Sequence, residues 1–331
     1  MILAGDIGGT KTNLGFFERE GGQLQCVVSQ QYPSRSAASL DELCRQFLSE
    51  HDAQAEAACF GVAGPCRKGV CTAMNLPWRV DGQQLGQMLG IDHTSVINDL
   101  QATAYGILVL PEEDFAVIQQ GDPDAKGNAA VIAAGTGLGE AGLYWDGSTY
   151  QPVASEGGHC DFAAKDELEI ELLQFLRKQF AHVAWERILS GPGLVHLYEF
   201  FKARGDASPA PDVAEEIRSK DPGAAITQAA LSDRCPVCRQ ALELFSAIYG
   251  AEAGNLGLQM MATGGVYLGG GIAPRIRSML DTDAFREAFV AKGRLRSLLE
   301  AIPVRIVMTD QAALWGAANC ARLASDARSA G

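Results

Sequence analysis

The chain has 331 residues, which suggests about two domains, and its apolar fraction of 47% is sufficient for a core in each. A net charge of −13, from 27 basic and 40 acidic residues, repels polyanions, so we expect no nucleic-acid partner. The N-terminus lacks a secretory signal and no run of about 18 apolar residues exists, so we expect no membrane span and a cytoplasmic protein whose nine cysteines are reduced thiols.

The first 110 residues alternate strands with helices. Three apolar or alternating runs at 2–7, 13–19 and 24–32 are separated by glycine-rich turns and predict a strand meander. A helix is expected from about Ser39 to Glu50, and strands at 57–62 and 94–98, the second running directly into a helix at 100–110. This alternation predicts an α/β fold.

The same pattern begins again after residue 110, with expected strands at 115–119, 129–134 and 141–145. Residues 165–261 are mostly helical, strands are expected at 265–269 and 304–308, and a helix at 312–324 is expected to pack on the first lobe. Two similar strand openings suggest two related lobes. We predict a small lobe of residues 1–110 plus about 303–331, and a large lobe of residues 111–302.

Polar and glycine residues recur at the carboxyl ends of the predicted strands. They are Asp6, the pair Asn98 and Asp99, the turn Gly135–Gly137 and the turn Gly269–Gly271. In open α/β sheets, ligands bind outside these strand ends. The pattern therefore predicts one ligand cleft between the lobes.

The octet GDIGGTKT, residues 5–12, resembles a phosphate-binding loop but has Thr10 where a Walker A motif requires glycine. Two interpretations stay open: a hairpin whose backbone amides bind an anion, or an ordinary Gly-Gly hairpin turn. A carboxylate at Asp6 is costly in a central strand and is explained by Mg²⁺ held through water, which favours the first interpretation.

Residues Gly137, Gly139 and Gly142 match the dinucleotide fingerprint G-x-G-x-x-G, which would indicate an NAD-dependent oxidoreductase. That fingerprint must open a helix, whereas the residues that follow continue as a strand. We therefore expect a strand-turn-strand hairpin that presents Thr136 and backbone donors to a phosphate.

Several acidic and histidine residues have both a functional and a structural interpretation. Asn98 or Asp99 either caps the following helix or, for Asp99, serves as a general base. Glu156 and His159 either bind a polyol from a loop or, for the histidine, fill a structural position; Glu186 either binds substrate or is a solvated acid beside Arg187. The isolated pair Cys235 and Cys238 lacks the further ligands that zinc needs.

Taken in order, the motifs GDIGGT, IND, GTGLG, SEGGH, ERILSGPG, GGVYLGGGIAPR and TDQAALWGA resemble the bacterial glucokinase family over nearly the whole chain. The resemblance implies the hexokinase branch of the actin-like ATPase (ribonuclease H-like) fold, with an active-site cleft between two lobes. It also implies ATP- and Mg²⁺-dependent phosphorylation of glucose to glucose 6-phosphate in glycolysis. The chain lacks the clustered-cysteine zinc motif of the neighbouring repressor and kinase family.

By this resemblance, Asp99 is the general base, and glucose is bound by Asn98, Asp99, Glu156, His159 and Glu186. The ATP-binding residues are expected to be Asp6, Gly8, Gly9, Thr10, Lys11, Thr12, Gly135, Thr136, Gly137, Gly269, Gly270 and Gly271, with Asp6 holding Mg²⁺ through water. Some relatives carry a neutral residue at the position of Lys11, so its contact with phosphate is left open. We expect a homodimer with glucose and ATP as ligands.

Other functions remain as alternatives at this point. They are a kinase for another hexose such as mannose or glucosamine, use of polyphosphate as the donor, and a non-catalytic sugar-sensing repressor. The repressor would need a DNA-binding module, for which the residues before Gly5 leave no room.

Overall fold

The computed structural model of the chain describes residues 1–51, 53–74, 76–205, 207–208 and 210–329. It divides into two compact units, each described here by itself. The first comprises Met1–Asp114, Pro152–Ala154 and Thr309–Gly331, and the second comprises Phe115–Gln151 and Ser155–Met308. Strand β14 (Val304–Val307) belongs to the second unit, although the sequence placed residues from about 303 onward with the first.

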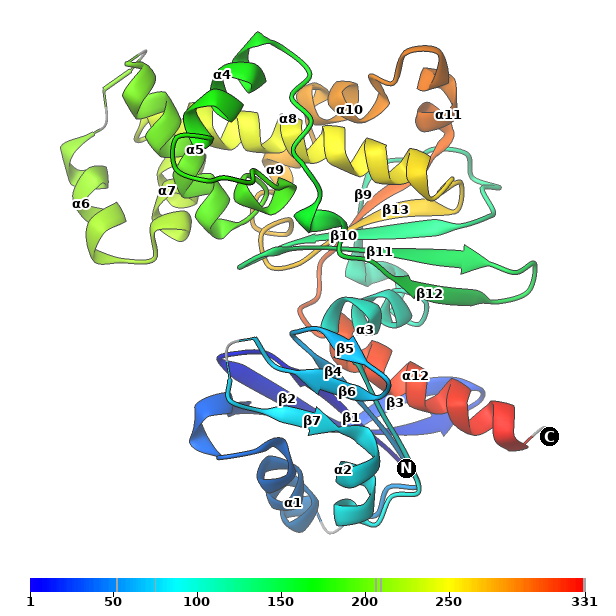
Figure 1. The fold of residues 1–331 in the computed structure, drawn as a ribbon. Coiled ribbons are helices and arrows are strands. Elements are labelled where there is room, and N and C mark those ends of the chain that lie inside the picture. Colours follow the sequence, from blue (N-terminus) through cyan, green and yellow to red (C-terminus); the bar gives the residue numbers. More distant parts are fainter. Residues whose placement is uncertain (52, 75, 206, 209, 330–331) are drawn as a thin grey trace. The chain divides into compact units, whose positions relative to one another are not determined.

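The first unit is built on a five-stranded sheet in the order β3-β2-β1-β4-β8 (Figure 1). Strands β1 (Ile2–Ile7), β2 (Lys11–Glu20) and β3 (Gln23–Pro33) form the expected antiparallel meander, while β4 (Ala57–Val62) and β8 (His93–Asn98) run parallel to β1. A small sheet of β5 (Cys66–Arg67), β6 (Val70–Thr72) and β7 (Arg79–Asp81) follows β4 in the chain.

Both faces of the first sheet are buried. Successive side chains of a strand point to opposite faces, so neighbouring residues of one strand belong to different core clusters. Leu3 and Ile7 of β1 pack in one core cluster, and Ile2 and Ala4 in another. Helices α1 (Leu40–His51) and α2 (Gly82–Leu89) cover the first cluster, and helix α12 (Ala312–Ser329) contributes to the second, as expected for the C-terminal helix. Figure 1 shows α3 (Asp99–Gly106) on the same side as α12. The 3-10 turns are η1 (Ser34–Ser36) and η2 (Glu112–Asp114).

The second unit repeats this arrangement in a six-stranded sheet, β12-β11-β10-β13-β14-β9. An antiparallel pair of β10 (Ala129–Ala134) and β11 (Leu138–Trp145) is again followed by parallel neighbours, β13 (Gly265–Gly269) and β14. Strand β9 (Phe115–Gln119) pairs antiparallel with β14. The other edge is β12 (Tyr150–Ala154), whose residues Pro152–Ala154 are grouped with the first unit. The shared order explains the two similar strand openings in the sequence.

Helices of the second unit gather on one side of its sheet, where the long helix α8 (Pro236–Gln259) packs on β10 and β13 (Figure 1). The others are α4 (Glu167–Leu176), α5 (Gly191–Arg204), α6 (Pro211–Ser219), α7 (Pro222–Leu231), α9 (Arg277–Leu280), α10 (Asp283–Val290) and α11 (Arg296–Ala301). Three 3-10 turns complete the unit: η3 (Gly157–His159), η4 (Trp185–Arg187) and η5 (Gly293–Leu295). One large apolar cluster joins these helices to the sheet.

The expectation that all cysteines are reduced thiols is wrong for one pair. Cys66 and Cys71 stand opposite each other in the register of β5 and β6 and form a disulfide. The tight turn at Lys68 and Gly69, both with positive φ, places the two side chains together. The remaining cysteines are free thiols: Cys26, Cys44, Cys59, Cys160, Cys235, Cys238 and Cys320. Among the described residues, no helix has both the length and the apolar character of a membrane span.

Candidate active site

The β1–β2 turn is a tight hairpin held by Ser34. The backbone N–H of Gly8 donates to the carbonyl of Lys11 at 2.9 Å, and the Ser34 hydroxyl donates to the carbonyl of Gly8 at 2.7 Å. Thr10 and Lys11 are exposed. This hairpin therefore has the local geometry of the ordinary turn, and its exposed tip with Gly8 and Gly9 is the part that can meet a ligand.

Thr12 differs from the other residues that the sequence assigned to ATP. Its side chain is fully buried, and its hydroxyl lies 2.9 Å from the Ser34 hydroxyl. Because Ser34 already donates to Gly8, Thr12 is the donor in this pair. Thr12 is thus a residue that braces the hairpin, with its hydroxyl engaged by Ser34.

Asp6 lies in a cluster of carboxylates at the end of β1. Burial, together with the nearby charges of Asp99 and Asp310, raises the pKa of Asp6 to about 6, against an opposing hydrogen bond from Asn13 Nδ2 at 3.2 Å. Excess negative charge in a partly buried site is the condition that a divalent cation relieves. Among the described residues, no group of three or more histidine, cysteine, aspartate or glutamate side chains is arranged to hold a metal directly.

Gly61 explains how Asp6 and Asp99 come close to each other. It is the register partner of Asp6 on β4, and a Cβ on Gly61 would lie 2.7 Å from the Cβ of Ala102 and 3.6 Å from the Cα of Asp99. A side chain here would push helix α3 away, since contacts below about 3 Å are repulsive. Glycine lets the first turn of α3 approach the strand beside Asp6.

Asn98 and Asp99 occupy the start of helix α3. Asn98 is the N-cap: its Oδ1 accepts from the backbone N–H groups of Leu100 at 2.9 Å and Gln101 at 3.3 Å, and its Nδ2 donates to the carbonyl of Gly64 at 3.1 Å. The capping interpretation is thus confirmed for Asn98. Asp99 is partly exposed in the first turn, where the helix dipole favours its negative charge.

The β10–β11 turn in the second unit is a compact loop. The N–H of Gly135 donates to the carbonyl of Gly137 at 2.8 Å, and the carbonyl of Gly135 accepts from the N–H of Gly191, also at 2.8 Å. Thr136 is exposed at its tip. Strand β11 continues as far as Trp145, so no helix follows the glycines and the NAD-dependent alternative is dismissed.

A cavity of about 1010 Å³ adjoins this turn, which is large enough for a nucleoside. Its walls come from four segments: Gly135 and Thr136; Gly191, Pro192 and Leu194 to His196; Asp221 to Ala224 with Thr227, Gln228 and Leu231; and Gly271, Ile272, Arg275 and Ile276. The sequence had assigned no role in binding to the segments at the starts of α5 and α7. The SGPG run at 190–193, part of the ERILSGPG motif, was the available signal.

Of the predicted glycine turn at 269–271, only Gly271 lines this cavity. Gly269 is buried at the end of β13, and a Cβ on it would lie 3.4 Å from the Cβ of Ala133. Gly270 has φ +79, and its Cα packs against the backbone of Ala134. Gly269 and Gly270 therefore shape the turn, and Gly271 is the one of the three that meets the cavity.

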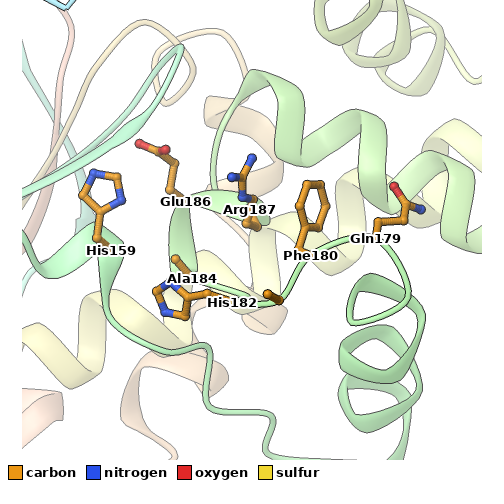
Figure 2. A pocket seen from close by; sticks show the side chains of 8 residues that line it. His159, Gln179, Phe180, His182, Ala184, Glu186 and Arg187 are labelled. Carbon is orange, nitrogen blue, oxygen red and sulfur yellow. The ribbon is translucent and has the colours of Figure 1, made fainter.

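A second pocket, of about 300 Å³, contains two of the predicted sugar ligands (Figure 2). It is lined by His159, Gln179, Phe180, Ala181, His182, Ala184, Glu186 and Arg187. Figure 2 shows His159 and Glu186 at one end and Gln179 and Phe180 at the other. The Arg187 guanidinium stacks 4.4 Å from the centre of the Phe180 ring, which holds it on the pocket wall.

Glu186 is not a solvated acid beside Arg187. It is partly buried, and its Oε2 accepts a hydrogen bond of 3.0 Å from the backbone N–H of Leu138, the residue after the Gly135–Gly137 turn. Glu156 is exposed and directly precedes η3, the short 3-10 turn that ends at His159. Glu156 and His159 therefore lie on a loop and not on a longer helix, as expected. Glu156 is not among the residues that line the pocket.

Two acidic residues near these sites were missed. Asp310 follows β14 at the carboxyl end of a strand, as Asn98 and Asp99 follow β8, so the same rule could have found it. Glu140 follows the Gly135–Gly137 turn on β11 and is buried. The alternation of residues along this strand did not predict that the Glu140 side chain would be buried. The pair Cys235 and Cys238 is buried at the start of α8 and takes part in no metal cluster of the described residues.

Comparison with known proteins identifies the family. A model of the glucokinase family matches residues 3–324. The chain is 42% identical over 336 residues to a glucokinase of Nostoc punctiforme, with 97% of this chain and 98% of that one covered.

Solved structures support the same family assignment. The crystal structure of a glucokinase from an Antarctic psychrotroph is 34% identical, with a TM-score of 0.86 over 97% of this chain and 98% of that one. A ROK-family glucokinase from Streptomyces griseus, crystallised with glucose and AMPPNP, shares the fold at 22% identity and a TM-score of 0.65, covering 97% and 99% of the two chains. The α/β fold with two mixed sheets is thus one found in glucokinases and ROK-family sugar kinases, and the chain belongs to the glucokinase family.

Proposed function

We propose that this protein transfers the γ-phosphoryl group of ATP to the 6-hydroxyl of glucose. The observation that carries the proposal is the full-length similarity to glucokinases, including one at 42% identity. The pocket with His159 and Glu186 supports it, because a sugar hydroxyl needs both a donor and an acceptor. The cavity beside Gly135 and Thr136 supports a nucleotide in the same unit.

Glucose is proposed to contact Asn98, Asp99, Glu156, His159 and Glu186. Asn98 uses its side chain for capping and for Gly64, so its part is to fix the start of α3 and present Asp99. Asp99 is the proposed general base and accepts the proton of the 6-hydroxyl as the phosphoryl group transfers. The transition state is loose, so positioning and charge neutralisation contribute more than covalent help.

ATP phosphates are proposed to meet the tips of the two hairpins, at Gly8 to Lys11 and at Gly135 to Gly137. Bound Mg²⁺ would neutralise charge on the phosphates. Asp6, with Asp99 and Asp310 nearby, would hold that ion through water, in keeping with the raised pKa of its carboxyl. The adenosine is proposed to occupy the cavity that Gly271 lines.

The proposal requires the two units to act as lobes that close on one glucose, because Asp99 belongs to the first unit and Glu186 to the second. Closure would exclude water, the competing acceptor, and so favour sugar phosphorylation over ATP hydrolysis. A homodimer and a cytoplasmic location are part of the proposal. Light scattering of the purified protein tests the first of these.

Coupled kinase assays test the proposal. We expect turnover with ATP and glucose, none with 6-deoxyglucose, which lacks the accepting hydroxyl, and weaker use of mannose and glucosamine. Polyphosphate in place of ATP tests the donor. Absence of activity with every hexose would refute the kinase function, whereas a better acceptor than glucose would change only the substrate.

A further inference from the structure

Two carboxyl groups face each other inside the second unit, away from the proposed ligands. Glu140 on β11 and Glu252 on α8 are each only 2% exposed, and their side chains interact. Oε1 of Glu140 lies beyond hydrogen-bonding distance of any donor among the described residues. Two buried carboxylates side by side are unfavourable unless at least one carries a proton.

The charged groups around the pair do not neutralise Glu140. Lys292 lies nearest to Glu252, but its ammonium donates to Asn255 Oδ1 at 2.6 Å and to the carbonyl of Ala251 at 2.8 Å. Asn255 in turn donates to Glu252 Oε2 at 2.7 Å. Lys292 therefore reaches the pair only through Asn255, on the Glu252 side.

Other titratable groups nearby are already engaged. Tyr249 feels the charge of Glu140, but its hydroxyl donates to the carbonyl of Ile132 at 3.1 Å. Farther off, Lys165 is paired with Glu169. Burial accordingly raises the pKa of Glu140 to about 7, although its interaction with Glu252 opposes this shift, and burial together with the charge of Glu140 raises the pKa of Glu252 to about 8.

Glu140 supports the loop that carries Glu156 and His159. A Cβ on Gly157 would overlap Oε2 of Glu140, and one on Gly158 would overlap the carbonyl of Leu138. The loop is therefore seated directly on β11, with the Gly157 backbone against the Glu140 carboxyl. The same short stretch of β11 supplies the N–H that holds Glu186.

We propose that Glu140 is a positioning residue: a proton shared with Glu252 holds its carboxyl against Gly157 and so fixes the glucose-binding loop. This inference rests on the proposed function. A shared proton lets the two side chains lie together, whereas two anions separate and move Gly157. Because Gly157 directly follows Glu156 and lies two residues before His159, the displacement reaches both proposed sugar ligands.

The sign of the pH effect follows from the raised pKa values. Both groups are protonated below about pH 7, and the pair keeps one proton between about pH 7 and 8, so the stabilisation of the loop is lost as pH rises through these two values. We expect the KM for glucose to rise above pH 8, with a much smaller change in kcat. A misplaced binding loop weakens substrate affinity by roughly tenfold.

The experiment compares wild type with Glu140→Gln, Glu252→Gln and the matched control Glu243→Gln, an exposed glutamate on the same helix as Glu252. Glutamine keeps the shape and supplies a permanent N–H donor in place of the titrating proton. We measure the KM for glucose, kcat and the melting temperature from pH 6.5 to 9. Direct glucose binding, followed by calorimetry, accompanies the kinetics.

The expected result is a KM that rises above pH 8 in wild type and in Glu243→Gln and stays level in the Glu140 and Glu252 variants. An equal pH profile in wild type and Glu140→Gln would overturn the proposal. So would a Glu140→Ala variant that melts earlier yet keeps the wild-type KM, because that is the signature of a purely structural residue. A wild type that neither phosphorylates nor binds glucose at pH 7 refutes the proposed function instead.

Discussion

Glu186 and Leu138 are joined by a hydrogen bond of 3.0 Å, from the Leu138 backbone N–H to Oε2 of Glu186. Leu138 is the first residue after the Gly135–Gly137 turn, and Glu186 lines the pocket with His159. A Cβ on Gly137 would overlap the same carboxylate oxygen. The proposed sugar acid and the proposed phosphate turn are thus one connected piece of structure.

This connection predicts different results for two substitutions of Glu186. Glu186→Gln keeps an oxygen to accept from Leu138 but loses the charge, so the KM for glucose should rise by roughly 10-fold to 100-fold, the value of a hydrogen bond to a charged group. Glu186→Ala also releases the turn, so the KM for ATP should rise as well. Steady-state kinetics with each substrate varied in turn measure both. Equal effects of the two variants on ATP would contradict the link.

Asp99→Asn tests the general base. We expect kcat to fall by roughly 10²-fold to 10⁴-fold, the usual contribution of a positioned base, while glucose binding by calorimetry changes little. Stability should stay nearly constant, since the lost helix-dipole attraction is offset by less repulsion with Asp6. A variant with the wild-type kcat would remove Asp99 from this role.

Asn98→Ala is the control for the same helix start. Loss of the cap should lower the free energy of unfolding by about 1 kcal/mol, because the N–H of Gln101 loses its side-chain acceptor and that of Leu100 keeps only Oδ1 of Asp99. Urea denaturation of both variants separates the two roles. A stable Asn98→Ala protein would mean that the cap contributes little.

The disulfide between Cys66 and Cys71 predicts how the thiols react. Alkylation of the denatured, non-reduced protein should modify seven cysteines, and prior reduction should expose the remaining pair. Cys66→Ser with Cys71→Ser should lower the free energy of unfolding by no more than about 2 kcal/mol, because the bond closes only a short loop. Modification of all nine without reduction would mean that the hairpin forms without the bond.

Much of the fold was accessible from the sequence because local patterns decide it. Apolar or alternating runs predicted most strands of the two large sheets, but not β12 or the small sheet of β5 to β7. The strand expected after Gly137 excluded the dinucleotide fingerprint. The carboxyl ends of strands indicated Asp6, Asp99 and the Gly135 turn. These features depend on neighbours in the sequence, which is the range over which such patterns carry information.

The remaining features depend on partners far away in the chain. In the sequence, Thr12 resembles the other turn residues, and only the structure shows that its hydroxyl bonds to Ser34. Likewise, Gly270 resembles a ligand-binding glycine in the sequence, and only the structure shows that Ala134 packs against it. Asp310 adds to the charge near Asp6 although about 300 residues separate them. Contacts of this kind arise when strands assemble into a sheet, and no spacing rule within one segment reports them.

Asp6→Asn provides the test of that carboxylate cluster. The pKa of Asp6 is raised from 3.8 to about 6, so its ionised form destabilises the fold; the penalty is absent below about pH 4 and is complete above pH 6. Removing the charge should therefore raise the free energy of unfolding at pH 8 by up to about 3 kcal/mol and leave it unchanged at pH 4. Thermal or urea unfolding across this pH range measures the difference.

Magnesium should stabilise the two proteins to different extents. If Asp6 holds Mg²⁺ as proposed, the ion should raise the melting temperature of the wild type, most clearly above pH 6 where Asp6 is ionised, and that of Asp6→Asn only a little. Activity should fall in the variant even though it is the more stable protein. Asp92→Asn, at an exposed aspartate of the same unit, should follow wild type throughout. If the melting temperatures of Asp6→Asn and wild type instead change in parallel with pH and Mg²⁺, the ion is not held at Asp6.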